Sequence, residues 1–258
     1  MSESIVVDHV SKDFTLQYHR TLKQMAVATM RGLPLRENFR AVNDVSFTVE
    51  QGESIGLMGL NGSGKSTLLM LINGVMRPDA GTIRTRGRIA GLIATGAGFQ
   101  PQLSGRDNLF LNGAILGMTE AEIRRKFDEI VDFADIGKFI DTPVSHYSSG
   151  MYARLGFSIA IHVDADIFLA DEVLAVGDRP FKKKCMSKMQ EIRQQGTTIF
   201  YVSHASASVR AMCDRVLVLE SGHLNFDGDV DQGIRYLQYD EDEETTEAVA
   251  DSELGADV

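Results

Sequence analysis

The sequence predicts an α/β fold in which a parallel sheet is covered by helices on both faces. Three short apolar segments, at residues 54–58, 165–172 and 197–204, alternate along the chain with segments of helical pattern. Strands buried on both faces have continuous apolar runs of this kind, which are typical of parallel sheets. A glycine-rich stretch, GLNGSGKST at residues 59–67, joins the first strand to a helix. The 258 residues, 43% of them hydrophobic, are enough for one large core.

Local patterns predict the other elements. A loosely alternating strand is expected at residues 4–10, and two strands within residues 41–59 are joined by a turn at Gln51-Gly52. A hairpin is expected at residues 215–228, with its turn at Ser221-Gly222. Apolar spacing and terminal glycines predict helices at four further ranges: 66–76, 121–136, 152–163 and 181–196.

The net charge of −10 is concentrated at the C-terminal end. Residues 240–258 contain nine acidic residues and no basic one, which leaves 27 acidic against 26 basic residues elsewhere. This near-neutral body does not indicate nucleic-acid binding, and we expect no nucleic-acid partner. We expect residues 239–258 to be a disordered acidic tail, either a solubilising end or an interaction arm, because they offer little apolar surface to bury. No apolar run approaches the ~20 residues that span a bilayer, so a membrane role would need a partner.

The stretch at residues 59–67 fits the pattern of a phosphate-binding loop, in which glycines let backbone N–H groups turn toward phosphate oxygens. A strand before it and a helix after it favour this interpretation over a glycine-rich loop with an incidental lysine. Lys65 is expected to neutralise the β- and γ-phosphates, Ser66 to bind Mg²⁺, and Thr67 to contact the phosphates. The nucleotide ligands expected in this loop are Gly59, Leu60, Asn61, Gly62, Ser63, Gly64, Lys65, Ser66 and Thr67.

Two further segments carry chemistry that one phosphate-binding loop does not supply. The strand within residues 165–172 ends in Asp171 and Glu172. Asp171 suits a Mg²⁺ ligand, and Glu172 suits a group that polarises an attacking water. An acidic pair at this position could instead cap a helix. Ser148-Ser149-Gly150, ahead of an apolar helix, is a second anion-binding design. A head-to-tail pair of chains would use both loops, with Ser149 of one copy closing on the ATP held by Lys65 of the other.

With these motifs, the sequence from Ser4 to Gln238 resembles the nucleotide-binding subunit of ATP-binding-cassette (ABC) transporters. The resemblance implies a P-loop ATPase domain over residues 1–238, with a parallel-sheet core, an antiparallel β subdomain and a helical subdomain at roughly 101–162. It implies that residues 147–151 are the signature loop, in which Ser148, Ser149 and Gly150 contact nucleotide. Further roles follow from matching motifs: Walker B at Ile167–Asp171, catalytic Glu172, the D-loop ending at Asp178, and the switch histidine His204.

Several of these assignments leave alternatives open. His204 could be a buried histidine at a strand end, and Phe14, expected to lie against adenine, could be a plain core residue or be replaced by Tyr18. The family's Q-loop glutamine should fall near Thr95, whereas the glutamines here are Gln100 and Gln102. The expected ligands of Mg²⁺ are therefore Ser66, Asp171 and Gln100.

The motif variants are most similar to the ATPases of polysaccharide exporters, which move O-antigen, teichoic acid and related lipid-linked glycans. YSSGMYARLGFSIA, DEVLAVGD and TGAGFQPQLSGRDNL carry this resemblance. It implies ATP hydrolysis at the cytoplasmic face of the membrane, a second copy of the chain and an integral membrane permease as partners, and a lipid-linked glycan as cargo. Finer details resemble an actinobacterial branch that exports a cell-wall galactan precursor. The alternative is an ABC ATPase that serves another lipid or drug exporter.

Residues 18–40 have no place in a minimal ABC ATPase. They contain five Lys or Arg and a single acidic residue, Glu37. Leu22, Met25 and Met30 could share one helical face, so we consider a short amphipathic helix at the membrane rim or a solvated insertion packed on the sheet.

Overall fold

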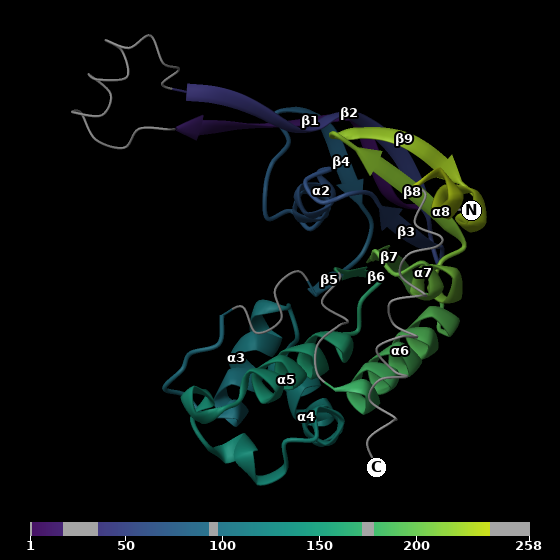
Figure 1. Ribbon diagram of the computed structural model, residues 1–258. Coiled ribbons are helices and arrows are strands. Elements are labelled where there is room, and N and C mark those ends of the chain that lie inside the picture. Colours follow the sequence, from purple (N-terminus) through teal and green to yellow (C-terminus); the bar gives the residue numbers. More distant parts are fainter. Residues whose placement is uncertain (1, 18–35, 93–97, 172–177, 238–258) are drawn as a thin grey trace, which may run out of the picture.

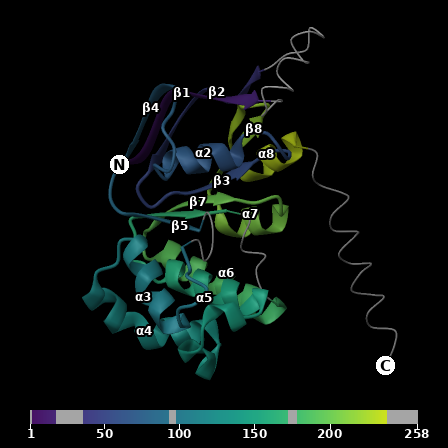
Figure 2. The same cartoon turned by 90° about the vertical axis from the view of Figure 1, so that its left-hand side faces the viewer.

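The computed structural model describes residues 2–17, 36–92, 98–171 and 178–237. Figure 1 shows their arrangement, and Figure 2 shows the layers from the side. An antiparallel sheet and helix α2 (Lys65–Ile72) lie above a central sheet, and a group of helices lies below it. None of the helices in the described ranges is long and apolar enough to cross a membrane.

The central sheet has the strand order β5-β6-β7-β3-β8-β9. Its first five strands are parallel, and β9 runs antiparallel to β8. Every residue of β3, β6 and β7 is buried, which confirms that these apolar runs form two-sided buried strands. The bounds of the strands are β3 Ser54–Met58, β5 Ile89–Leu92, β6 Ile167–Ala170, β7 Thr198–Val202, β8 Arg215–Glu220 and β9 His223–Gly228.

The antiparallel sheet pairs β2 (Arg36–Glu50), β1 (Glu3–Gln17) and β4 (Ala80–Thr85), in that order. Strands β1 and β2 are longer than the sequence predicts, because their pairing continues to Gln17 opposite Arg36. Most of the paired residues in this extension are polar, so an apolar pattern does not reveal it. Residues 36–40, which we assigned to the insertion at 18–40, therefore belong to β2, and the proposed amphipathic helix lies outside the described residues.

The helical layer contains α3 (Gly105–Ile115), α4 (Glu120–Ala134) and α5 (Ser149–Ile161), with short 3₁₀ turns η1 (Gly137–Asp141) and η2 (Val144–His146). Each of the three α-helices starts after a serine or threonine whose side chain accepts a hydrogen bond from a backbone N–H group of the first turn. Helices α6 (Arg179–Gln194), α7 (Ser206–Met212) and α8 (Val230–Tyr236) complete the fold.

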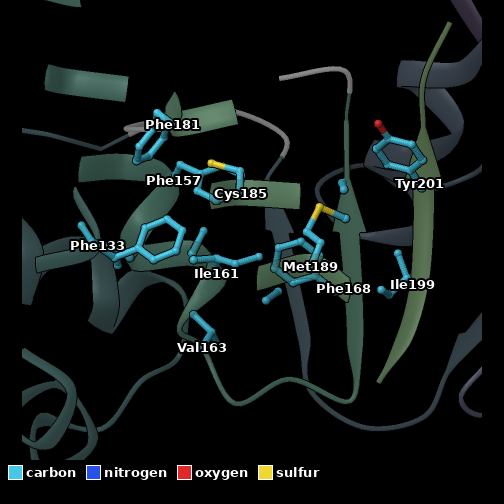
Figure 3. Close-up of a cluster of buried hydrophobic side chains, with 14 of the residues drawn as sticks. Phe133, Phe157, Ile161, Val163, Phe168, Phe181, Cys185, Met189, Ile199 and Tyr201 are labelled. Carbon is cyan, nitrogen blue, oxygen red and sulfur yellow. The ribbon is translucent and has the colours of Figure 1, made fainter. Parts of the chain in front are cut away.

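An aromatic cluster holds the helical layer to α6, as Figure 3 shows. Phe133 of α4 and Phe157 of α5 stack with ring centroids 6.2 Å apart, and Phe181 of α6 meets Phe157 edge-on at 6.0 Å. Phe157 is fully buried. Because burying one such side chain is worth about 1.5–3 kcal/mol, this cluster contributes substantially to the attachment of the helices.

Candidate functional site

Three strand ends bring the predicted catalytic segments to one edge of the central sheet. Strand β3 lies beside β7, with Leu57 opposite Val202, and β7 lies beside β6, with Ala170 opposite Tyr201. Since these strands are parallel, the loop after Met58, the residues after Val202 and Asp171 all emerge at the same edge. Ligands of open α/β sheets bind outside the carboxyl ends of the strands, so this edge is the candidate site.

The phosphate-binding loop is shaped by glycines at positions where a side chain cannot fit. Gly59 and Gly64 have φ values of 146° and 106°. A Cβ atom on Gly59 would lie 2.1 Å from the carbonyl oxygen of Leu219, and one on Gly64 would lie 2.2 Å from that of Ala41. The loop is thus pressed between β8 and β2, and only glycine allows this close approach.

Lys65 starts helix α2, and its side chain folds back over the loop. Its Nζ donates hydrogen bonds to the carbonyl oxygens of Gly59, at 2.6 Å, and Leu60, at 2.9 Å. The buried hydroxyl of Ser63 makes no hydrogen bond with any residue the structure describes. A buried hydroxyl without a partner, next to a helix N-terminus and an ammonium group, is suited to an anionic ligand.

The other predicted ligands of this edge differ in exposure. Ser66 is exposed, Thr67 and Asp171 are half-buried, and His204 is half-buried just beyond β7. Glu172, the predicted catalytic carboxylate, lies outside the described residues. The structure therefore brings Lys65, Asp171 and His204 to one edge and leaves the placement of Glu172 undescribed.

Ser148 and Ser149, the predicted signature serines, lie in the helical layer, apart from the phosphate-binding loop of the same chain. The Ser148 Oγ accepts a hydrogen bond of 3.2 Å from the backbone N–H of Met151 and so caps α5. Ser149, the next residue, is exposed. Helices α2 and α5 lie on opposite sides of the central sheet, as Figures 1 and 2 show.

Arg154 is a functional candidate that our sequence analysis missed. Its Nη2 donates a 2.6 Å hydrogen bond to Asp178, and its Nη1 lies 3.4 Å from an oxygen of Asp135. The hydrogen bond from Arg154 lowers the pKa of the Asp178 carboxyl below its ordinary value. Arg154 is three residues beyond Met151 on α5, so Asp178, the predicted D-loop aspartate, is hydrogen-bonded to the helix that follows the predicted signature serines. Only the contact between α5 and α6 reveals this link.

Gln100 and Gln102 are both exposed, at the start of the helical layer. The backbone N–H of Gln100 donates a 2.6 Å hydrogen bond to the buried side chain of Asn108, whose amide in turn donates to the Gln100 carbonyl at 3.0 Å. Thr95 lies outside the described residues. The assignment of Gln100 as a Mg²⁺ ligand stays a prediction, as does that of Phe14 as a base contact. Phe14 is half-buried on β1, directly opposite Phe39 of β2, and Tyr18 lies outside the described residues.

The matches to known proteins agree with this geometry. The family model described as ABC transporter matches residues 42–175. The ABC transporter protein AbcA of Aeromonas salmonicida is 50% identical over 191 residues, which are 74% of this chain and 62% of AbcA. The O-antigen export system ATP-binding protein RfbB of Klebsiella pneumoniae is 42% identical over 87% of this chain and 93% of its own. The teichoic acids export ATP-binding protein TagH of Bacillus anthracis is 42% identical over 93% of this chain, which spans only 43% of TagH.

Solved structures share the fold at lower identity. A dimeric ATP-binding cassette in a post-hydrolysis state with ADP and Pi superposes with a TM-score of 0.70 at 20% identity, over 88% of this chain and 98% of that one. An ATP-binding subunit of an ABC transporter gives a TM-score of 0.71 at 22% identity, over 93% and 95%. The predicted fold class, a P-loop α/β domain of the ABC ATPase type, is thereby confirmed. With the phosphate-binding loop, Asp171 and His204 at one sheet edge and a family match over half its length, the chain belongs to the ABC transporter family, as one of its ATPase chains.

Proposed function

We propose that the chain is the ATP-hydrolysing subunit of an exporter that moves lipid-linked polysaccharide across the cytoplasmic membrane. The observation that supports ATP hydrolysis is that Lys65, Asp171 and His204 all follow strands that end at the same carboxyl edge, that of β3, β6 and β7. The names of the relatives RfbB and TagH, which are export ATP-binding proteins for O-antigen and teichoic acids, support the cargo class.

Each residue at the edge has a defined task in this proposal. The Lys65 ammonium leaves its own loop carbonyls and neutralises the β- and γ-phosphates, while the N-terminus of α2 adds its partial positive charge. Glu172 and His204 orient the water that attacks the γ-phosphate. Catalysis then rests on positioning and charge neutralisation and needs no covalent intermediate.

Ser66 and Asp171 are suited to hold Mg²⁺. A hydroxyl and a carboxylate are oxygen ligands of the kind this ion takes. The described residues contain no group of three or more His, Cys, Asp or Glu side chains placed to hold a metal by themselves. This suits an ion that binds together with the phosphates of its nucleotide, where it would neutralise charge that develops on the phosphate oxygens.

A second copy of the chain would complete each ATP site. Ser149 is exposed at the N-terminus of α5, on the opposite side of the central sheet from α2 of its own chain. Its backbone N–H and hydroxyl are therefore available to the γ-phosphate held by Lys65 of a partner copy in a head-to-tail dimer. Closure of the dimer would drive an integral membrane permease, which would hold the chain at the cytoplasmic face of the membrane.

The substitution Glu172→Gln tests the catalytic part of the proposal. The variant should bind ATP and accumulate as a closed dimer in its presence, because the water is no longer polarised. Dimerisation is measured by size-exclusion chromatography with ATP and Mg²⁺, and hydrolysis by phosphate release. Glu191→Gln, an exposed change on α6, is the matched control and should behave as wild type. Hydrolysis by Glu172→Gln at the wild-type rate would refute the assigned role.

The cargo is tested in cells. Depletion of the chain should cause lipid-linked glycan to accumulate at the cytoplasmic face of the membrane. Complementation with Glu172→Gln should fail to relieve this accumulation. A cell-wall galactan precursor is the finer prediction about this glycan. Accumulation of a different lipid, with glycan export intact, would favour the alternative of another lipid or drug exporter.

A further inference from the structure

Strands β1 and β2 carry two phenylalanines opposite each other near the end of their hairpin. Phe14 pairs with Phe39 in the antiparallel ladder, and Figure 1 shows these strands running past α2. Directly opposite residues of an antiparallel pair lie on the same face. The two side chains therefore belong to one face of the hairpin, and Phe39 remains 46% exposed there.

This face includes residues of the core that contains helix α2, which follows the phosphate-binding loop. Side chains alternate along β1, so Val10, Lys12 and Phe14 share a face. Val10 is fully buried in the core cluster that also contains Leu68 of α2, and the Lys12 Nζ lies 5.9 Å from the centroid of the Phe14 ring. Phe14 and Phe39 thus lie on the strand face that carries Val10, which belongs to the same buried cluster as Leu68 of α2.

The strand carrying Phe39 is also in direct contact with the loop. Val42 pairs with Lys12 and Arg40 with Asp13, so Ala41 is an extra, bulged residue of β2. The Ala41 carbonyl is the group that a Cβ atom on Gly64 would strike. Arg40 donates hydrogen bonds to both carboxylate oxygens of Asp13, at 2.7 and 3.1 Å, and this pair holds β1 and β2 together next to the two phenylalanines.

We propose that Phe39 is a second aromatic contact for the nucleotide base, beside Phe14. The inference rests on the proposed function, because it requires a nucleotide whose phosphates lie in the loop at residues 59–67. Phe39 is an exposed aromatic ring two residues from Ala41, where β2 contacts the loop. The base of that nucleotide is the part of the ligand that fits such a ring. Stacking on aromatic rings does not distinguish one base from another, because every base offers a flat π-face. Phe39 therefore raises affinity for purine nucleotides without selecting between them.

Calorimetric binding to the full chain with Mg²⁺ tests this, using ATP, GTP and inorganic tripolyphosphate as ligands. Phe39→Ala should weaken ATP and GTP by about tenfold each, which is the size expected for one base–aromatic contact. Its affinity for tripolyphosphate should stay within about twofold of wild type, because no base is present. Phe39→Tyr retains an aromatic ring and should restore ATP binding. Phe139→Ala removes an equally exposed phenylalanine from the helical layer and should change none of the three affinities.

The outcomes separate the inference from the proposed function. Wild-type ATP affinity in Phe39→Ala would overturn the inference, and so would an equal loss of ATP and tripolyphosphate, which would mean that Phe39 acts through the shape of the loop. A wild-type chain that binds neither ATP nor tripolyphosphate would instead refute the proposed function.

Discussion

Replacing Gly64 by alanine tests whether the phosphate-binding loop requires glycine because of the backbone packed against it. A Cβ atom at Gly64 would lie 2.2 Å from the carbonyl oxygen of Ala41, at a φ of 106°. At Gly62, in the same loop, φ is 81° and no atom lies within 4 Å of the added Cβ. The two substitutions therefore share the positive-φ strain and differ in the steric clash.

The difference in stability follows from these two terms. Positive-φ strain on a non-glycine residue costs roughly 1–2 kcal/mol, which is the whole cost expected for Gly62→Ala. Gly64→Ala must also displace the Ala41 carbonyl, and β2 is held there by the Asn43 N–H, which donates to the Gly222 carbonyl at 2.8 Å. Overpacking of this kind costs about 1–3 kcal/mol more. We expect Gly64→Ala to lose about 2–5 kcal/mol of unfolding free energy.

Urea unfolding of the nucleotide-free chain, followed by circular dichroism, measures these free energies. Gly74→Ala, at a φ of 74° beyond α2 with no atom within 4 Å of the added Cβ, is a second control and should resemble Gly62→Ala. If Gly64→Ala unfolds within about 0.5 kcal/mol of Gly62→Ala, the contact with Ala41 does not explain the glycine, and the reasoning is refuted.

Three further predictions concern the helical layer. Phe157→Ala should lower the unfolding free energy by about 3–5 kcal/mol in urea, because Phe157 is fully buried between two other rings; a loss under about 1 kcal/mol would contradict this. Burial lowers the pKa of His162 below the ordinary histidine value of about 6.5, so the unfolded chain binds more protons than the folded chain as the pH falls through that value. The unfolding free energy of wild type, measured in urea titrations, should therefore fall relative to that of His162→Gln between pH 7.5 and 5.5. A difference between the two free energies that does not change with pH would contradict this. Arg154→Gln should let the carboxyl pKa of Asp178 rise toward its ordinary value in an NMR titration, and an unchanged pKa would disprove the pairing.

Some elements escaped the sequence because their stabilising contacts are not local. Helix α3 was not predicted, since Gly105, Asn108 and Gly113 interrupt its apolar pattern. The structure explains these residues: Asn108 is fully buried because its side chain hydrogen-bonds the backbone at Gln100 and Ser104, and a Cβ on Gly113 would lie 2.9 Å from Ile123 of α4. Whether such a segment forms a helix therefore depends on packing partners elsewhere in the chain.

The sequence by itself determined whatever is encoded in adjacent residues. The buried strands at 54–58, 167–170 and 198–202 were predictable because continuous apolar runs indicate parallel strands, and the loop at 59–67 because its ligands are consecutive in the chain. Only the tertiary structure decided which of these segments meet. The order β6-β7-β3 brings Asp171, His204 and Lys65 to one edge, although up to 139 positions separate them along the chain. Strand order and side-chain packing depend on contacts between distant residues, and local periodicity carries no record of them.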